Sequence, residues 1–390
     1  MSTTSSFTQL RDLHERESLA TLLDELADQL RAARQYHELF EVLKLRLRHQ
    51  LELPLLYDDS GDELGEATRG GLERGLLDAC REVGTSLFLD GKPSEGWMYL
   101  RAIGNRKESA ELLRQVEVTE TGMDELIQVA IYEGVDTEYG FGLLLEHYGI
   151  CNAITTYETV MPERSGSEQQ AVADLLLNEL YKDLMSNVAS DREQRDESAP
   201  EYQSLWELID GHDELFEENA YHIDTSHLAA VTRFARTLDD PASLAKGWEL
   251  SQYGQRLAEM YQQSDSPPFE DYYQSHGHIF AALMAKEATE VQAALDFFRT
   301  KAEQVDESSS MSNSREVYID LLVRTDRGSD AIRETVRLYP DVIPRGLLSL
   351  LLEEVVRTGT YDELLDFAEQ REDLLTYGTV LALRKQNSAQ

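Results

Sequence analysis

Cysteine, lysine and long apolar runs are scarce in this 390-residue chain, and each scarcity excludes a class of protein. The two cysteines, Cys80 and Cys151, are too few for a disulfide framework or a cysteine-based zinc site, so we expect reduced thiols buried among apolar neighbours. The longest apolar stretch, around residues 347–352, is far too short to cross a bilayer. The first residues lack the basic and apolar segments of a secretory signal. We therefore expect a cytoplasmic protein that does not enter the membrane.

Basic residues are few as well, and this shortage bears on the choice of partner. The chain has 74 acidic and 36 basic residues, which leave a formal net charge of −38. Such a field repels polyanions, so we expect neither a nucleic acid nor an anionic membrane as a partner, whereas a basic protein would be attracted. The alternative is that the acidity serves only to keep a large surface soluble.

Strand signals are nearly absent, and helical periodicity takes their place. Apolar residues recur every three or four positions in three clear stripes. These stripes are Leu19, Leu22, Leu23, Leu26 and Leu30; Leu72, Leu76, Ala79, Cys80, Val83 and Leu87; and Leu228, Val231, Phe234, Ala235 and Leu238. The sequence therefore predicts an all-α protein.

The same turn chemistry recurs along the chain, and this recurrence favours repeats. Residues 35–40 and 360–365 both place an aromatic residue and an acidic first turn before an apolar stripe. Gly84 is followed by Gly96, Leu100 and Ile103, with a turn at residues 90–94 between the two helices.

This spacing resembles the small and apolar positions of a tetratricopeptide repeat. Related pairs begin near residues 148, 294 and 326. The resemblance implies a degenerate α-α superhelix, in which stacked antiparallel helix pairs cover one another's apolar faces. A single multi-helix domain is the alternative. The charged, apolar-poor segment 188–200 predicts a linker or a poorly packed helix end between two helical-repeat regions, 1–187 and 201–390.

No motif for a bound cofactor or a catalytic centre is present. The sequence lacks a dinucleotide fingerprint, a phosphate-binding loop, a His-Glu-x-x-His zinc helix and a Gly-x-Ser-x-Gly elbow, so we expect no cofactor. Five of the nine histidines, however, lie between residues 212 and 278, near several carboxylates. Imidazole with carboxylate suits zinc, iron or manganese. The candidate metal ligands are His222, His227, His276, His278, Asp224 and Glu217.

Each of these candidates also has a purely structural interpretation. Asp224, or one of the two residues after it, is a suitable N-cap for the stripe that begins at Leu228, and His227 would then lie in the first helical turn. Tyrosines cluster in the same region, and Tyr253, Tyr272 and Tyr273 are candidates for gripping a basic side chain of a partner. Alternatively, these rings pack between helices.

Two functions follow from these patterns. The first is a non-enzymatic scaffold that binds a basic protein partner on a concave helical surface lined by Tyr, Asp and Glu. The second is a helical metal-binding protein or enzyme built on the histidine cluster around residues 217–278. Convergence of at least three of the candidate ligands would favour the second function.

Overall fold

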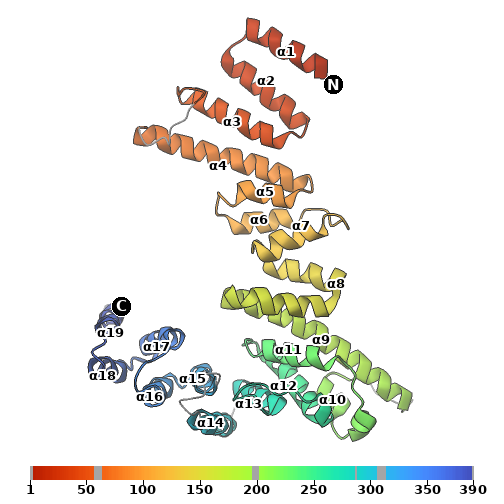
Figure 1. Ribbon diagram of the computed structural model, residues 1–390, viewed down its shortest axis with the longest axis vertical. Coiled ribbons are helices and arrows are strands. Elements are labelled where there is room, and N and C mark those ends of the chain that lie inside the picture. Colours follow the sequence, from red (N-terminus) through yellow and green to blue (C-terminus); the bar gives the residue numbers. More distant parts are fainter. Residues whose placement is uncertain (1–2, 57–63, 196–201, 286–287, 305–312, 389–390) are drawn as a thin grey trace. The chain divides into compact units, whose positions relative to one another are not determined.

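The computed structural model describes residues 3–56, 64–195, 202–285, 288–304 and 313–388 (Figure 1). Across these residues the chain forms helices and no strand, and neighbouring helices pack in pairs. The predicted all-α class is confirmed. None of the described helices is both long enough and apolar enough to cross a membrane. The chain divides into two compact units, Met1–Ala153 and Ile154–Gln390.

The first unit is a succession of helices packed against one another. Its elements are α1 (Thr3–Arg16), α2 (Leu19–Ala32), α3 (Tyr36–Gln50), α4 (Glu66–Leu89), α5 (Pro93–Leu100), α6 (Arg106–Leu113), α7 (Met123–Ile127), a π-helical turn η1 (Gln128–Tyr132) and α8 (Thr137–Val160), whose last residues belong to the second unit. Each helix from α1 to α5 packs against the next along the chain, while α7 and η1 pack against α5. The predicted stripes supply its core, because Leu23, Val83 and Leu87 are buried between α2, α3 and α4. Cys80 is only partly buried and Cys151 is exposed, so the expectation of buried thiols is wrong for Cys151.

Two small residues set the distance between α4 and α5. A Cβ atom on Gly84 would lie 2.7 Å from Leu100 Cγ and 3.0 Å from the Gly96 carbonyl oxygen. A Cβ atom on Gly96 would overlap the Phe88 ring and lie 2.8 Å from the Gly84 carbonyl oxygen. The two backbones therefore approach each other closely at Gly84 and Gly96, where a side chain would not fit.

The second unit begins with the end of α8 and continues in the same manner. Its elements are η2 (Met161–Glu163), α9 (Gly166–Arg195), α10 (Leu205–Ile209), η3 (Asp213–Asn219), α11 (Thr225–Ala235), α12 (Pro241–Arg256), η4 (Glu259–Tyr261), α13 (Tyr272–Met284), α14 (Ala288–Glu303), α15 (Ser314–Arg324), α16 (Gly328–Leu338), α17 (Arg345–Thr358), α18 (Asp362–Gln370) and α19 (Leu374–Asn387). From α11 to α16 each helix packs against its successor. In addition, α18 packs against α16 and α19, and α19 packs against α17.

The segment 188–200, predicted as a linker or a poorly packed helix end, is in large part the end of a helix. Residues 188–195 continue α9, and Val188 at their start is fully buried. The guanidinium groups of Arg192 and Arg195 donate to the carbonyl oxygens of Leu208, at 3.1 Å, and Glu214, at 2.9 Å, so this charged helix end is tied to the next segment. Residues 196–200 lie outside the described residues. The chain divides into its two units earlier than this segment.

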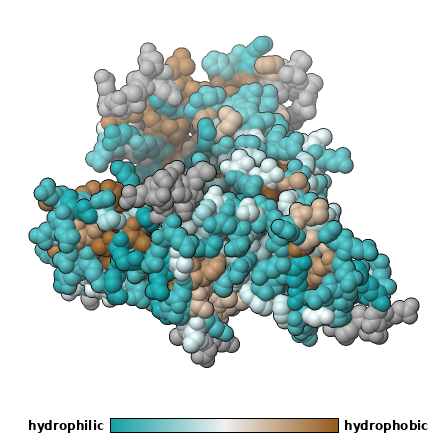
Figure 2. Space-filling view, turned by 60° about the horizontal axis from the view of Figure 1, so that its bottom comes forward, coloured by the Kyte–Doolittle hydropathy of each residue, from teal (hydrophilic) through white to brown (hydrophobic). Residues whose placement is uncertain are grey.

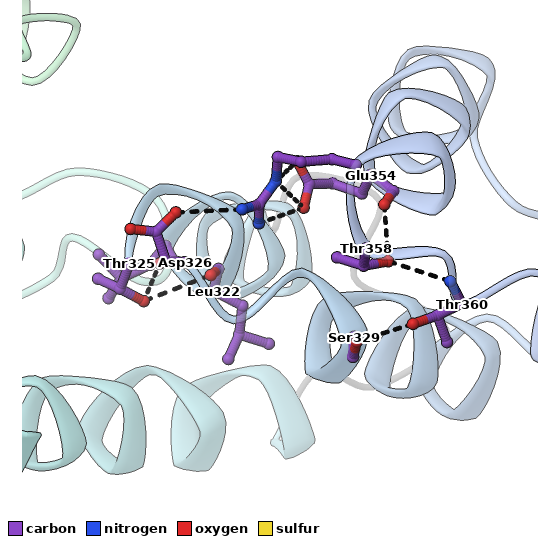
Figure 3. Close-up of polar contacts among 9 residues, drawn as sticks. Leu322, Thr325, Asp326, Ser329, Glu354, Thr358 and Thr360 are labelled. Atoms are coloured by element: carbon purple, nitrogen blue, oxygen red, sulfur yellow. Dashed lines mark hydrogen bonds and ion pairs between the residues drawn. The ribbon is translucent and has the colours of Figure 1, made fainter. Parts of the chain in front are cut away.

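A polar cluster joins the turn before α16 to the end of α17 (Figure 3). Glu354 is buried, and Arg357 Nη2 donates to its carboxylate at 2.7 Å. Arg357 Nη1 reaches across to Asp326 in the α15–α16 turn, at 3.2 Å. The hydroxyls of Ser329 and Thr360 are 2.8 Å apart. These contacts fix the connection from which α18 and α19 follow.

Candidate functional site

His222 belongs to a partly buried hydrogen-bonded series in the second unit. Its backbone N–H donates to the Tyr253 hydroxyl at 2.8 Å, and its Nδ1 lies 3.0 Å from the same hydroxyl. Because an ionised carboxylate only accepts, the Nε2–H of His222 donates to Asp191, at 3.2 Å. Arg195 also donates to Asp191, and these two partners together hold the pKa of the carboxyl below its usual value against the opposing effect of burial. These hydrogen bonds tie the segment before α11 to α9 and α12.

The other candidates in this segment cap a helix or face solvent. Asp224 is the N-cap of α11, because its carboxylate accepts from the backbone N–H groups of Ser226, at 2.8 Å, and His227, at 3.2 Å. The predicted cap is thus confirmed, and His227 lies in the first turn as expected. Glu217 is exposed in η3. None of these three residues points to a common site with His222.

His276 and His278 are packed separately on α13. His276 lies between the rings of Phe269 and Tyr272, at centroid distances of 4.6 and 4.4 Å, and its Nδ1–H donates to the Tyr272 carbonyl at 2.8 Å. Burial lowers the pKa of His276 to about 3, so its ring is neutral. His278 stacks on Phe297, 4.4 Å away. Across the described ranges, no group of three or more His, Cys, Asp or Glu side chains could hold a metal ion, so the predicted metal ligands do not converge there.

The three candidate tyrosines are core residues. Tyr253, Tyr272 and Tyr273 are at most 4% exposed. The Tyr272 hydroxyl donates to the Ala229 carbonyl at 2.7 Å, and the Tyr273 ring fills the space left open by Gly254 on α12. Their assignment to partner binding is corrected, because a ring enclosed between helices cannot reach a partner on the surface.

An apolar stripe on α19 is the clearest uncovered surface feature of the second unit. Leu374, Leu375 and Leu381 are 84%, 80% and 43% exposed, and the small residues Gly378 and Ala382 lie exposed between and beside them. This spacing places all five on one helical face. The opposite face, with Thr376 and Val380, is buried against the neighbouring helices. The helix therefore has two apolar faces and covers only one.

A pocket of about 490 Å³ lies beside this stripe, at the turn between α18 and α19. Ala368, Leu374 and Tyr377 form its apolar side, while Glu369, Glu372 and Asp373 line it with carboxylates. A pocket with this lining suits a lysine or arginine side chain, whose hydrocarbon stem lies on apolar groups while the cationic head meets carboxylates. We call the stripe and the pocket together the α19 surface.

Some carboxylates on α18 and in the turn after it are uncompensated. Within the described part of the chain, Asp366 and Glu369 on α18 and Glu372 in the turn have no ion pair. At the start of α18, Asp362 is paired with Arg384 at 2.9 Å and Glu363 with Arg333 at 3.8 Å. Three nearby charges of one sign repel one another and attract cations. Asp373 is occupied differently, because its carboxylate caps α19 by accepting from Thr376. The α19 surface thus combines exposed leucines with unpaired acids.

Several contacts hold α19 in place. The Asn387 side-chain amide donates to the Val356 carbonyl, at 3.2 Å, and to the Tyr361 hydroxyl, at 3.0 Å. Arg384 binds Asp362 at the start of α18.

The face of the molecule drawn in Figure 2 is mostly hydrophilic, with hydrophobic residues gathered in separate patches. No protein-family model matches the chain, and no curated protein sequence matches it.

Proposed function

We propose that the chain is a non-enzymatic, cytoplasmic scaffold of the tetratricopeptide-like kind, and that the α19 surface binds a basic amphipathic helix of a partner protein. The observation that carries the proposal is the exposed leucine stripe beside unpaired carboxylates. The backbone contact between Gly84 and Gly96 supports the repeat-like character, because small residues at paired positions are what the resemblance implies.

The chemistry of the occupant follows from the two parts of this surface. A helix that lays leucine-sized side chains along Leu374, Leu375 and Leu381 removes apolar area from water, and a fully buried leucine contributes about 1.5–3 kcal/mol. Lysine or arginine at the edge of that helix meets Glu369 and Glu372 in the pocket. An acidic helix of the same shape is repelled, so charge decides which amphipathic helix binds.

Three synthetic peptides test the proposal. The first is a Leu/Lys peptide with helical apolar spacing, the second is a scrambled peptide of the same composition, and the third replaces Lys by Glu. We expect the first to bind the full chain at least about tenfold more tightly than the second, and the third not to bind. Equal binding of the first two peptides would mean that net charge alone attracts them, and it would refute the α19 surface as the site.

Surface variants locate the binding. Replacing both Leu374 and Leu375 with Ser is expected to weaken binding of the first peptide at least about tenfold, because two apolar contacts are lost. Met260→Ser is the matched control, since Met260 is 70% exposed on another segment of the same unit and its loss should leave binding unchanged. Glu369→Gln with Glu372→Gln should weaken binding mainly at low salt, where screening is least.

A further inference from the structure

A second pocket, of about 250 Å³, lies among α11, α13 and α15 and shares no residue with the α19 surface. Most of its wall is a single face of α15, because its residues follow the helical spacing i, i+3, i+4, i+7, i+8 and i+11. These residues are Asn313, Glu316, Val317, Asp320, Leu321 and Arg324. Arg236, which ends α11, and Ile279 on α13 complete the pocket.

Arg236 brings to the pocket a positive charge that forms no ion pair with any described residue. Its guanidinium carbon lies 4.7 Å from the centre of the Phe269 ring, and within the described residues the guanidinium forms neither a hydrogen bond nor an ion pair. Arg324 differs, since it donates to the Arg236 and Leu238 carbonyls at 2.6 Å and binds Asp239 at 2.9 Å. Burial lowers the pKa of Arg236, and the Asp320 carboxylate opposes the shift only in part, because it forms no ion pair with the guanidinium.

Two carboxylates in the same pocket have oxygens that accept no hydrogen bond from the described residues. Asp320 has no hydrogen bond or ion pair among the described residues, and burial raises its pKa although Arg324 and Arg236 oppose the shift. One oxygen of Glu316 accepts from the Tyr339 hydroxyl, but the other, Oε2, is buried and has no partner. The pocket therefore presents a cation and two anionic groups that leave one another unpaired. Ile279, Val317 and Leu321 supply apolar lining beside them.

We propose that this pocket binds a free apolar α-amino acid. The ligand's carboxylate accepts from Arg236, its ammonium group donates to Asp320 and Glu316, and its hydrocarbon side chain lies against Ile279 and Leu321. A molecule with both charges satisfies all of these groups at once, whereas a molecule with one charge leaves the opposite group of the pocket desolvated. The inference does not depend on the α19 surface.

Calorimetric titration of the full chain tests the proposal with leucine and two analogues that each lack one charge. The analogue 4-methylpentanoate has no ammonium group, and 3-methylbutylamine has no carboxylate. Valine, methionine and phenylalanine are tested alongside leucine. We expect at least one of the four amino acids to bind at least about tenfold more tightly than the two single-charge analogues. If none of the four amino acids binds, or if an analogue binds equally well, the proposal is overturned.

Two substitutions assign the roles within the pocket. Arg236→Gln should weaken amino-acid binding at least about tenfold while leaving the weak binding of the amine unchanged. Asp320→Asn should weaken binding of the amino acid but not of the carboxylate analogue. It decides the matter alone if Arg236→Gln fails to fold, because Asp320 has no hydrogen bond or ion pair with a described residue that the change would break. Arg345→Gln replaces an exposed arginine outside the pocket and should change nothing. Wild-type affinity in Asp320→Asn would overturn the assignment.

Discussion

Two buried tyrosines should respond to the same substitution with opposite changes in stability. The Tyr253 hydroxyl accepts from the backbone N–H of His222 at 2.8 Å and lies 3.0 Å from its ring nitrogen. Tyr253→Phe leaves these groups without a partner, so we expect the free energy of unfolding to fall by about 1–3 kcal/mol. The Tyr273 hydroxyl is buried and makes no hydrogen bond with any described residue. Tyr273→Phe removes that unsatisfied group and should raise the free energy of unfolding by up to about 1 kcal/mol.

Chemical denaturation followed by tryptophan fluorescence measures both effects. Trp206 and Trp248 lie 5.2 Å apart in the second unit, so their emission reports on the unit that contains both tyrosines. The midpoints should move in opposite directions at an unchanged slope. If Tyr273→Phe is as destabilising as Tyr253→Phe, the hydrogen bonds do not distinguish the two rings, and the reasoning is refuted. If either change weakens binding of the basic peptide without affecting stability, the assignment of both rings to the core is refuted.

Two further predictions concern the helix contact in the first unit and the buried histidine. Gly96→Ala should destabilise the first unit by about 1–3 kcal/mol, because the new methyl group meets the Phe88 ring. Gly70→Ala, whose methyl group would have no neighbour closer than 3.9 Å, should stabilise the first unit by up to about 1 kcal/mol. Denaturant unfolding measures both variants, and a Gly96→Ala protein more stable than the Gly70→Ala protein would contradict the close approach of α4 and α5. The pKa of about 3 at His276 keeps the folded protein from taking up a proton that the unfolded chain binds below about pH 6.5. The free energy of unfolding is unaffected above that pH and falls by about 1.4 kcal/mol per pH unit between about pH 6.5 and 3. His276→Phe should therefore lose less stability on acidification than the wild type. Identical pH dependences of the two proteins would argue against a buried neutral ring.

The helical architecture could be predicted because it depends on local periodicity. The stripe from Leu228 to Leu238 predicts a buried helix face, and all five of its residues are buried in the structure. The N-cap of α11 could be narrowed from the sequence to Asp224, Thr225 or Ser226, and the structure shows that it is Asp224. The division of the chain was harder to place, because a charged composition at residues 188–195 does not reveal that a helix continues there with Val188 packed beneath it.

The candidate sites were less predictable because they depend on which side of a helix is covered. α19 has one apolar face through Val380 and another through Leu375, and the sequence alone does not tell which of them meets a neighbouring helix. Clustering of histidines and tyrosines in sequence was also a poor guide, because His222 and His276 lie on different elements with separate partners. The pocket residue Arg236 could have been noticed only once α15 was known to lie beside it.

Hydrogen–deuterium exchange of the full chain with and without the Leu/Lys peptide tests the central claim most directly. Helices α18 and α19 carry the leucines and acids of the α19 surface, so we predict slower exchange over residues 362–387 when the peptide is bound, and unchanged exchange over the first unit. Protection that appears elsewhere in the chain, with residues 362–387 unaffected, would contradict the proposed site.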